Sequence, residues 1–207
     1  MNTPETAFPK LVNPMTYQQF KNLSDELVAQ HRTSGPEQSE QRVNFTKLNQ
    51  QRMKRVEKQF ALQPELKQLL DQNERRWVWL VLVEAWCGDG AQLLPAIAAM
   101  AEEYTNIELS VLLRDENPAL MDTCLTNGSR AIPKLICLDA ETGERVFTWG
   151  PRPAGIQQQV KQLKAEKPDI SHEELVQQVQ LWYAKDRSQS LQQDFVQLLQ
   201  EVVNPVV

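Results

Sequence analysis

Cysteine is scarce in this sequence, and the three that occur, Cys87, Cys124 and Cys137, lie far apart. An odd number of widely separated cysteines does not form the disulfide framework of a small secreted protein. Only two histidines, His31 and His172, are present, and no pair among these five residues has the spacing of a zinc site. The sequence therefore predicts no structural disulfide and no bound metal, and it points to no cofactor.

Long apolar runs and a basic leader are also missing. No run is long enough to span a bilayer, and residues 1–15 lack the basic start and apolar core of a secretory signal. The formal net charge of −5 gives no electrostatic preference for nucleic acid or for an anionic membrane. We therefore expect a cytoplasmic protein with reduced thiols, and neither nucleic acid nor a membrane as its partner.

Three zones of the 207 residues differ in their pattern. Residues 1–75 are polar, rich in glutamine and helical in their period, whereas residues 76–165 alternate apolar strands with helices. Residues 166–207 are again helical and rich in glutamine, and Ser171–Glu174 has the form of a capping box. We expect an N-terminal helical extension, a central domain and a C-terminal helical extension. Because the extensions are too polar to form a core alone, they should pack on the central sheet, lengthen it or form a homodimer contact.

The central zone begins with an almost continuous apolar run, WVWLVLVEA at residues 77–85. Such a run is typical of a strand that is buried on both faces. Further helices and strands are expected in alternation at residues 91–104, 107–113, 117–125, 134–139, 145–149 and 153–163. The order predicts an α/β fold whose mixed sheet starts with parallel strands, ends with an antiparallel hairpin and carries helices on both faces.

A long helix is expected in the N-terminal zone, at about residues 37–60. Its apolar residues, Leu48 and Met53 among them, fall in one arc, and its lysines lie on the opposite, solvated face. Arg52 differs from the lysines because it projects on the apolar side. We interpret it as a structural arginine, either snorkelling or ion-paired, and a role near an active site is the alternative.

Cys87 lies in the stretch EAWCGDG (Glu84–Gly90), where the buried strand ends and a helix begins. Unpaired main-chain N–H groups and the helix dipole favour a thiolate at such a position, and the thiolate is the nucleophile. The negative charge of Asp89 opposes the thiolate, and the sequence leaves this balance open. We expect Cys87 to be accessible and more reactive than Cys124 or Cys137, with a buried structural cysteine as the alternative.

At these residues the chain resembles the thioredoxin superfamily. Trp86–Gly88 is similar to the Trp-Cys-Gly that ends the first long central strand of that family, and Pro95 is similar to the proline in its following helix. The run GSRAIPKL (Gly128–Leu135) resembles the segment that carries the family's cis-proline, here Pro133. The resemblance covers residues 76–165 and implies a thioredoxin-like fold. More narrowly, EAWCGDGAQ and WGPRP resemble a bacterial group of thioredoxin-like proteins with helical extensions.

The resemblance also implies the roles of several residues. Cys87 is expected to be the catalytic nucleophile, beside a cis bond between Ile132 and Pro133. A substrate is expected to dock at the residues around these two, namely Trp86, Gly88, Asp89, Gly90, Ile132 and Pro133. Residues at nearby strand ends could also line the site, with a structural ion pair as the alternative, namely Glu84, Arg114, Asp115 and Arg130.

One residue departs from the family: Gly90 stands in place of the second cysteine of Cys-x-x-Cys. A dithiol attacks a disulfide with one sulfur and releases the product with the other, so Cys87 alone can perform only the first step. Neither Cys124 nor Cys137 is a good substitute. We predict monothiol thiol-disulfide exchange with a protein or with a low-molecular-weight thiol or disulfide, and we expect Gly90→Cys to restore dithiol chemistry. A non-catalytic binding or scaffolding module is the alternative, so it stays open whether the protein is an enzyme.

Overall fold

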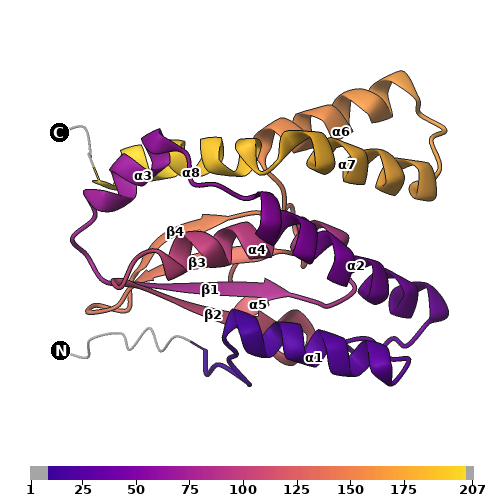
Figure 1. The fold of residues 1–207 in the computed structure, drawn as a ribbon, viewed down its shortest axis with the longest axis horizontal. Coiled ribbons are helices and arrows are strands. Elements are labelled where there is room, and N and C mark those ends of the chain that lie inside the picture. Colours follow the sequence, from indigo (N-terminus) through magenta and orange to yellow (C-terminus); the bar gives the residue numbers. More distant parts are fainter. Residues whose placement is uncertain (1–8, 204–207) are drawn as a thin grey trace.

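The structure is a computed structural model that describes residues 9–203. Residues 1–8 and 204–207 lie outside the described part. The expectation that residues 1–15 are not a secretory signal falls largely on these undescribed residues. Figure 1 shows the elements in chain order, and their bounds are α1 (Tyr17–Ala29), α2 (Glu40–Gln59), α3 (Pro64–Asp71), β1 (Trp77–Val83), α4 (Gly88–Glu102), β2 (Ile107–Leu113), the 3-10 helix η1 (Arg114–Glu116), α5 (Pro118–Met121), β3 (Lys134–Asp139), β4 (Arg145–Trp149), α6 (Ala154–Glu166), α7 (His172–Asp186) and α8 (Gln189–Val203).

The four strands form one mixed sheet in the order β2-β1-β3-β4. Strand β1 is parallel to β2 and antiparallel to β3, and β3 forms an antiparallel pair with β4. Six of the seven residues of β1 are buried, because this strand has neighbours on both edges and helices on both faces. The predicted order of elements and the predicted mixed sheet are therefore confirmed.

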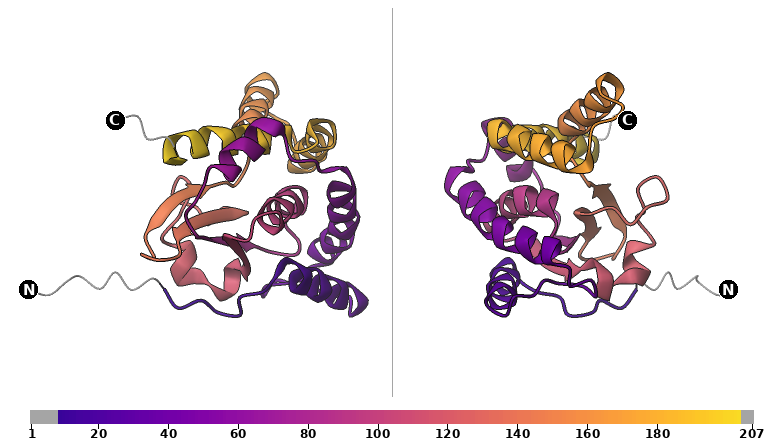
Figure 2. Two further views of the ribbon diagram at one scale, coloured as in Figure 1. Left: turned by 60° about the vertical axis from the view of Figure 1, so that its left-hand side comes forward. Right: turned by 90° about the vertical axis from the view of Figure 1, so that its right-hand side faces the viewer.

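One face of the sheet is covered by α4 and by the last helix, α8. Phe195 of α8 packs its ring edge-on against Trp79 of β1 and against Phe147 and Trp149 of β4, with centroid distances of 5.5, 6.3 and 5.6 Å. Helix α5 lies on the other side of the sheet from α4 (Figure 2). The C-terminal extension thus completes the core of the central domain.

The N-terminal extension packs on the same body. Helix α2 lies along α4 and α1 along α2, while α3 lies beside α8, so that segments from both ends of the chain meet (Figure 1). Before α1, Met15 pairs with Val111 through two main-chain hydrogen bonds of 3.0 and 2.8 Å, which cover the edge strand β2. The expectation that the extensions pack on the central sheet is confirmed.

Two local expectations need correction. Leu48, expected in the apolar arc of α2, is 47% exposed, and the buried stripe instead includes the polar residues Thr46 and Asn49. These two are buried because Thr46 bonds to the Thr33 hydroxyl and Asn49 donates to the Ala85 carbonyl. The lysines of α2 are exposed as expected.

The sequence pattern also predicts that α5 runs to about residue 125, but this helix ends at Met121. Its last turn tightens, because the N–H groups of Thr123 and Cys124 donate to carbonyls three residues back, at Leu120 and Met121. Cys124 therefore lies in a turn beyond the helix rather than inside it.

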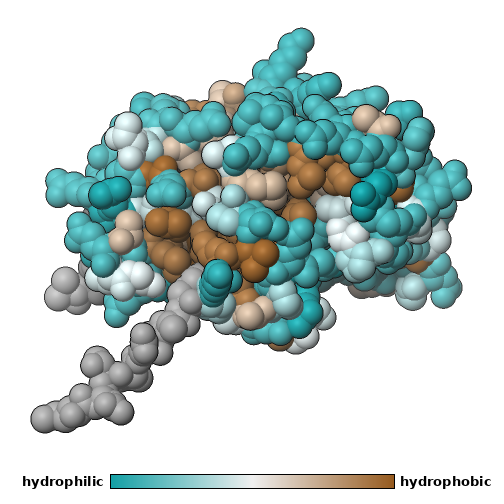
Figure 3. Space-filling model, turned by 90° about the horizontal axis from the view of Figure 1, so that it is seen from below, coloured by the Kyte–Doolittle hydropathy of each residue, from teal (hydrophilic) through white to brown (hydrophobic). Residues whose placement is uncertain are grey.

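Exposed apolar side chains of the described residues are scattered. From below, apolar side chains lie in patches among hydrophilic ones (Figure 3), and the large apolar residues that are exposed belong to separate segments, namely Val12, Leu48, Leu125 and Leu181. A homodimer through the extensions stays a prediction. Among the helices between residues 9 and 203, none combines the length and apolar character needed to cross a bilayer.

Candidate functional site

The turn between β1 and α4 places Cys87 at the cap position of α4. The main-chain N–H of Cys87 donates to the Glu84 carbonyl at 2.9 Å, which closes the turn after the strand. Its Sγ accepts a hydrogen bond from the N–H of Gly90 at 3.3 Å, as a helix-capping side chain does. The predicted position at a strand-to-helix junction is confirmed.

A second segment approaches the sulfur from the other side. The bond between Ile132 and Pro133 is cis, and the carbonyl of Ile132 lies 3.5 Å from the Sγ of Cys87, within reach of the thiol proton. The bond between Gly150 and Pro151 is also cis. Gly150, with φ of 106°, fits against Pro133, where an added Cβ would lie 2.4 Å from the Pro133 carbonyl oxygen. The predicted cis bond and its position beside Cys87 are therefore confirmed.

The expectation of an accessible thiol is wrong, and the higher reactivity of Cys87 stays a prediction. Cys87 is only 6% exposed, similar to Cys124 at 7%, whereas Cys137 in β3 is fully buried. Burial raises the pKa of Cys87 to about 12, and Asp89 raises it further, while hydrogen bonds from main-chain N–H groups and the charge of Arg152 lower it. Burial, which the sequence motif did not reveal, outweighs the helix start, so the resting group is a neutral thiol.

Asp89 connects the cysteine turn to a neighbouring loop. The guanidinium of Arg152 binds its carboxylate, with an Nη2–Oδ2 distance of 2.8 Å and contacts from Nε to both oxygens at 3.0 Å. Arg152 follows the second cis bond, so this ion pair fixes the loop after β4 against the start of α4. The pair partly neutralises the charge that Asp89 places beside the thiol.

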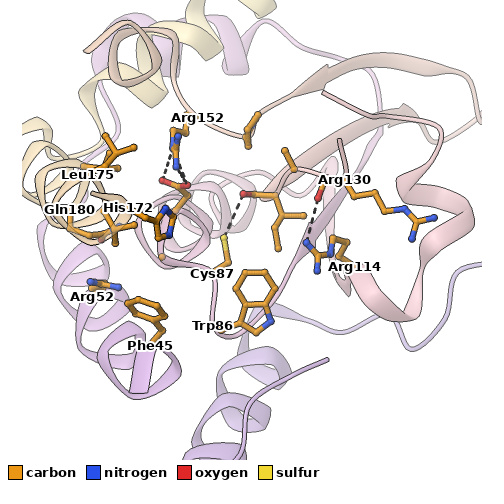
Figure 4. Close-up of a pocket in the computed structure, with 17 residues that line it drawn as sticks. Phe45, Arg52, Trp86, Cys87, Arg114, Arg130, Arg152, His172, Leu175 and Gln180 are labelled. Atoms are coloured by element: carbon orange, nitrogen blue, oxygen red, sulfur yellow. Dashed lines mark hydrogen bonds and ion pairs between the residues drawn. The ribbon is translucent and has the colours of Figure 1, made fainter. Parts of the chain in front are cut away.

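A pocket of about 380 Å³ lies over Cys87 (Figure 4). One wall comes from the central domain, which supplies the cysteine turn and loop residues around the two cis bonds. The other wall comes from α2 and α7 of the two extensions. The lining residues are Phe45, Arg52, Trp86, Cys87, Gly88, Asp89, Arg114, Arg130, Ala131, Ile132, Pro151, Arg152, His172, Leu175, Val176, Val179 and Gln180.

At Gly88 the two walls lie close together. A Cβ added there would lie 2.9 Å from the Gln180 Nε2 of α7 and 3.4 Å from the Arg52 Nη1 of α2. The side chain of Gln180 is itself held against α4, because the Gln92 Nε2 donates to the Gln180 Oε1 at 2.7 Å. The absence of a side chain at Gly88 thus lets the extensions close over the cysteine turn.

The structure brings together most of the predicted docking residues, but not all of them. Trp86, Gly88, Asp89 and Ile132 line the pocket with Cys87, whereas Gly90 and Pro133 are buried behind it. At Gly90 a Cβ would lie 2.4 Å from the Val83 Cγ2 of β1, so the side chain of Val83 occupies the space that a second cysteine would need.

The predicted lining residues at the strand ends fall into two groups. Arg114 and Arg130 line the pocket, but Glu84 and Asp115 do not. Glu84 is 1% exposed and accepts hydrogen bonds from the hydroxyl of Ser34 and, at 2.9 Å, from the N–H of Asp115. Burial raises the pKa of Glu84, and these two hydrogen bonds oppose the rise. Glu84 has a structural role, because its two hydrogen bonds join the loop before α2 to the segment that follows β2.

Three of the four arginines that line the pocket are held by a neighbouring carboxylate. Arg114 binds Asp115 at 2.8 Å, Arg130 binds Asp122 at 2.7 Å, and Arg152 binds Asp89. Arg114 also lies over the ring of Trp86, with 5.2 Å between the guanidinium carbon and the ring centroid. Figure 4 shows that Arg130 points away from Cys87.

The fourth arginine, Arg52, differs from the other three. In the described part of the chain it has no carboxylate within ion-pair distance, and its Nη1 donates only to the Asn49 amide oxygen at 2.7 Å. Burial lowers the pKa of Arg52, as does the charge of Arg55, and Asp89 raises it in part. Of the two structural roles expected from the sequence, snorkelling or ion-paired, the ion pair is absent from the described chain, and Arg52 lines the pocket, which is the alternative left open there.

Sequence reasoning missed the helix wall of the pocket. Phe45 of α2 and the residues of α7 were assigned to helices without a site, because the contacts that bring these helices to Cys87 are long-range. The one available signal was Arg52, which projects on the apolar side of its helix. No group of three or more His, Cys, Asp or Glu residues within the described chain could hold a metal ion.

The fold and the site together define the class of protein. A mixed sheet of this order, a cysteine at the first strand-to-helix turn and a cis-proline beside it are the features of a thioredoxin-fold protein. The thioredoxin family Thioredoxin_9 matches residues 35–164, and the chain belongs to that family. The match includes α2 and α3, so it begins before the central domain as the sequence pattern divides it.

Solved structures with a similar fold cover nearly the whole chain. A protein of unknown function from Pseudomonas aeruginosa is 20% identical, with a TM-score of 0.57 over 90% of this chain and 98% of that one. An HIV epitope-scaffold protein is also 20% identical, with a TM-score of 0.54 over 85% of this chain and 96% of that one. No curated protein sequence matches significantly. The likeness therefore shows the fold with its extensions and not an activity.

Proposed function

We propose that this protein carries out monothiol thiol-disulfide exchange through Cys87. The observation that carries the proposal is the position of the sulfur, which lines the pocket between the N–H of Gly90 and the carbonyl of Ile132. A disulfide that enters the pocket meets one sulfur only, since Cys124 and Cys137 do not line it. A reducing compartment such as the cytoplasm would supply the second thiol.

The reaction has two balanced steps. The thiolate of Cys87 attacks one sulfur of a disulfide, the S–S bond breaks, and the other sulfur leaves and takes up the proton that Cys87 lost. A low-molecular-weight thiol then attacks the mixed disulfide and releases Cys87. The Gly90 N–H is positioned to stabilise the thiolate in both steps. Asp89 and burial limit the rate, because at a pKa of about 12 only about one thiol in 100,000 is ionised at neutral pH.

A second candidate is a binding module that keeps the fold without turnover. The neutral resting thiol favours this candidate, because a low thiolate fraction limits attack on any disulfide. The side chain of Val83 favours it as well, since it fills the space beside Gly90 where a resolving sulfur would sit. Both candidates use the same pocket and differ in whether the sulfur reacts.

An uncharged disulfide, bis(2-hydroxyethyl) disulfide, tests the exchange without involving the arginines. We expect a mixed disulfide at Cys87, detected by intact mass spectrometry and peptide mapping, and its release by 2-mercaptoethanol. The rate should rise with pH, about tenfold per unit below the pKa, because it follows the thiolate fraction. Cys87→Ser is the control that removes the adduct. Modification of Cys124 alone, or no adduct even at high pH, would overturn exchange in favour of the binding module.

A further inference from the structure

The charge of the pocket is opposite to that of the whole chain. The formal net charge of the protein is −5, yet the pocket is lined by four arginines and by a single carboxylate, that of Asp89. Three of these arginines are neutralised locally by Asp89, Asp115 and Asp122. The excess positive charge at the site therefore comes from Arg52, on the wall that the N-terminal extension supplies.

Arg52 is placed to meet a molecule that is bound to Cys87. Its Nη1 lies 3.4 Å from where a Cβ of Gly88 would be, and Gly88 is adjacent to the cysteine. Figure 4 shows Arg52 on the α2 side of Cys87, with Arg114 on the opposite side. A half-buried guanidinium without a carboxylate in contact is unfavourable, because its hydration is reduced and the charge of Asp89 offsets this loss only in part.

The rest of the helix wall suits the body of a small aliphatic molecule. Phe45 of α2 and Leu175, Val176 and Val179 of α7 line the pocket and make this wall largely apolar. A volume of about 380 Å³ fits a small ligand and is at the lower end of the usual size of ligand pockets. A large peptide would have to displace α7, which is fixed to α4 through Gln92 and Gln180.

We propose that the pocket selects low-molecular-weight disulfides that carry a carboxylate, and that Arg52 is the specificity-determining residue that binds this carboxylate. The proposal rests on the proposed exchange at Cys87 and names the substrate class for it. A guanidinium and a carboxylate form paired hydrogen bonds, and the pairing is strongest where water is partly excluded. The sulfur of the disulfide then lies at Cys87, with its aliphatic part against the apolar wall.

Two disulfides of similar size and opposite charge test this proposal on the full chain. We expect 3,3′-dithiodipropionate to form the mixed disulfide with Cys87 at least about tenfold faster than cystamine. The reason is that Arg52 attracts the carboxylates of the first and repels the ammonium groups of the second. Arg52→Met should remove this preference by slowing dithiodipropionate, and Arg52→Lys should keep part of it. Lys54→Met is the matched control, because Lys54 also carries a positive charge on α2 but is exposed and does not line the pocket.

A binding measurement on Cys87→Ser separates the proposal from the reaction. Calorimetry should detect dithiodipropionate but not cystamine, and the added Arg52→Met change should abolish that signal. Binding without any exchange in the natural protein would support the carboxylate site and overturn the proposed reaction. Exchange at equal rates with both disulfides, or a preference that survives Arg52→Met, would overturn the carboxylate site and leave the reaction standing.

Discussion

The two walls of the pocket differ in both origin and chemistry. The wall from the central domain holds the sulfur, the cis bonds and arginines that are each neutralised by a carboxylate. The wall from α2 and α7 holds no nucleophile, but it supplies apolar side chains and the unpaired Arg52. The difference teaches how the proposed function would be divided: the central domain supplies the thiol, and the extensions supply the groups that select a ligand by size and charge.

The largest expected effect comes from Phe195 of α8, the helix that follows α7 and packs on the sheet. Phe195→Ala should lower the free energy of unfolding by about 3–5 kcal/mol, because it opens a cavity among Trp79, Phe147 and Trp149. Urea denaturation measures the loss, and faster alkylation of Cys87 should accompany it as α7 loosens. Leu181→Ala on α7 is the control, and since that leucine is 56% exposed the change should be within about 0.5 kcal/mol of zero. Equal effects of both substitutions would show that α8 does not anchor this wall.

A second substitution, on the wall from the central domain, tests whether there is space for a side chain at Gly90. Gly90→Cys alone should cost about 1–3 kcal/mol, because its Cβ would lie 2.4 Å from the Val83 Cγ2. Adding Val83→Ala should relieve this overlap. The Cβ of a residue at position 90 would lie 3.5 Å from the Cys87 Cβ, at the short end of the disulfide range of about 3.5–4.5 Å.

We therefore expect the double variant Val83→Ala, Gly90→Cys to form an intramolecular disulfide under mild oxidation and to reduce insulin with dithiothreitol. The matched control is Val83→Ala, Gly90→Ser, which has the space without the second sulfur. A disulfide that forms as readily in Gly90→Cys alone would mean that Val83 is no obstacle. A disulfide without insulin reduction would mean that the helix wall excludes protein substrates.

The smallest expected effect concerns the charges around the thiol on the wall from the central domain. Asp89→Asn should lower the pKa of Cys87 below about 12, since the thiolate loses a repulsive neighbour and Arg152 is freed to attract it. Each unit of this decrease raises the thiolate fraction at neutral pH about tenfold. The pH profile of iodoacetamide labelling measures it. Asp122→Asn also frees an arginine, Arg130, but away from the thiol, and it should leave the profile unchanged. An upward movement in Asp89→Asn would contradict the assignment of Asp89.

Local patterns in the sequence were enough to predict the fold and the centre of the site. The apolar run that became β1, the capping box at Ser171 and the resemblance around Cys87 and Pro133 all depend on residues close together in the chain. The cis bond beside the sulfur was predicted on the same basis, and it is present.

The rest of the site depends on contacts between distant segments, which no local pattern records. The burial of Cys87 requires α2 and α7 to close over it at Gly88, 92 residues before Gln180. The role of Glu84 was missed for the same reason, because its partner Ser34 lies 50 residues away. Arg52 shows the limit most clearly: its position on an apolar face was visible, but its lack of a carboxylate partner was not.

The late position of α7 in the chain has a consequence for the synthesis of the protein on the ribosome. Domains form from the N-terminus as the chain is synthesised, and residues 9–166 contain the whole sheet and the cysteine turn. Gln180 and the apolar residues of α7 emerge after all of these, and Phe195, which anchors the C-terminal extension, emerges later still. Until then the α7 wall of the pocket over Cys87 is missing, so the sulfur has less cover in the nascent chain than in the complete protein. The proposed carboxylate-binding residue, Arg52, is therefore in place early, whereas the apolar wall of α7 is added only when synthesis is nearly finished.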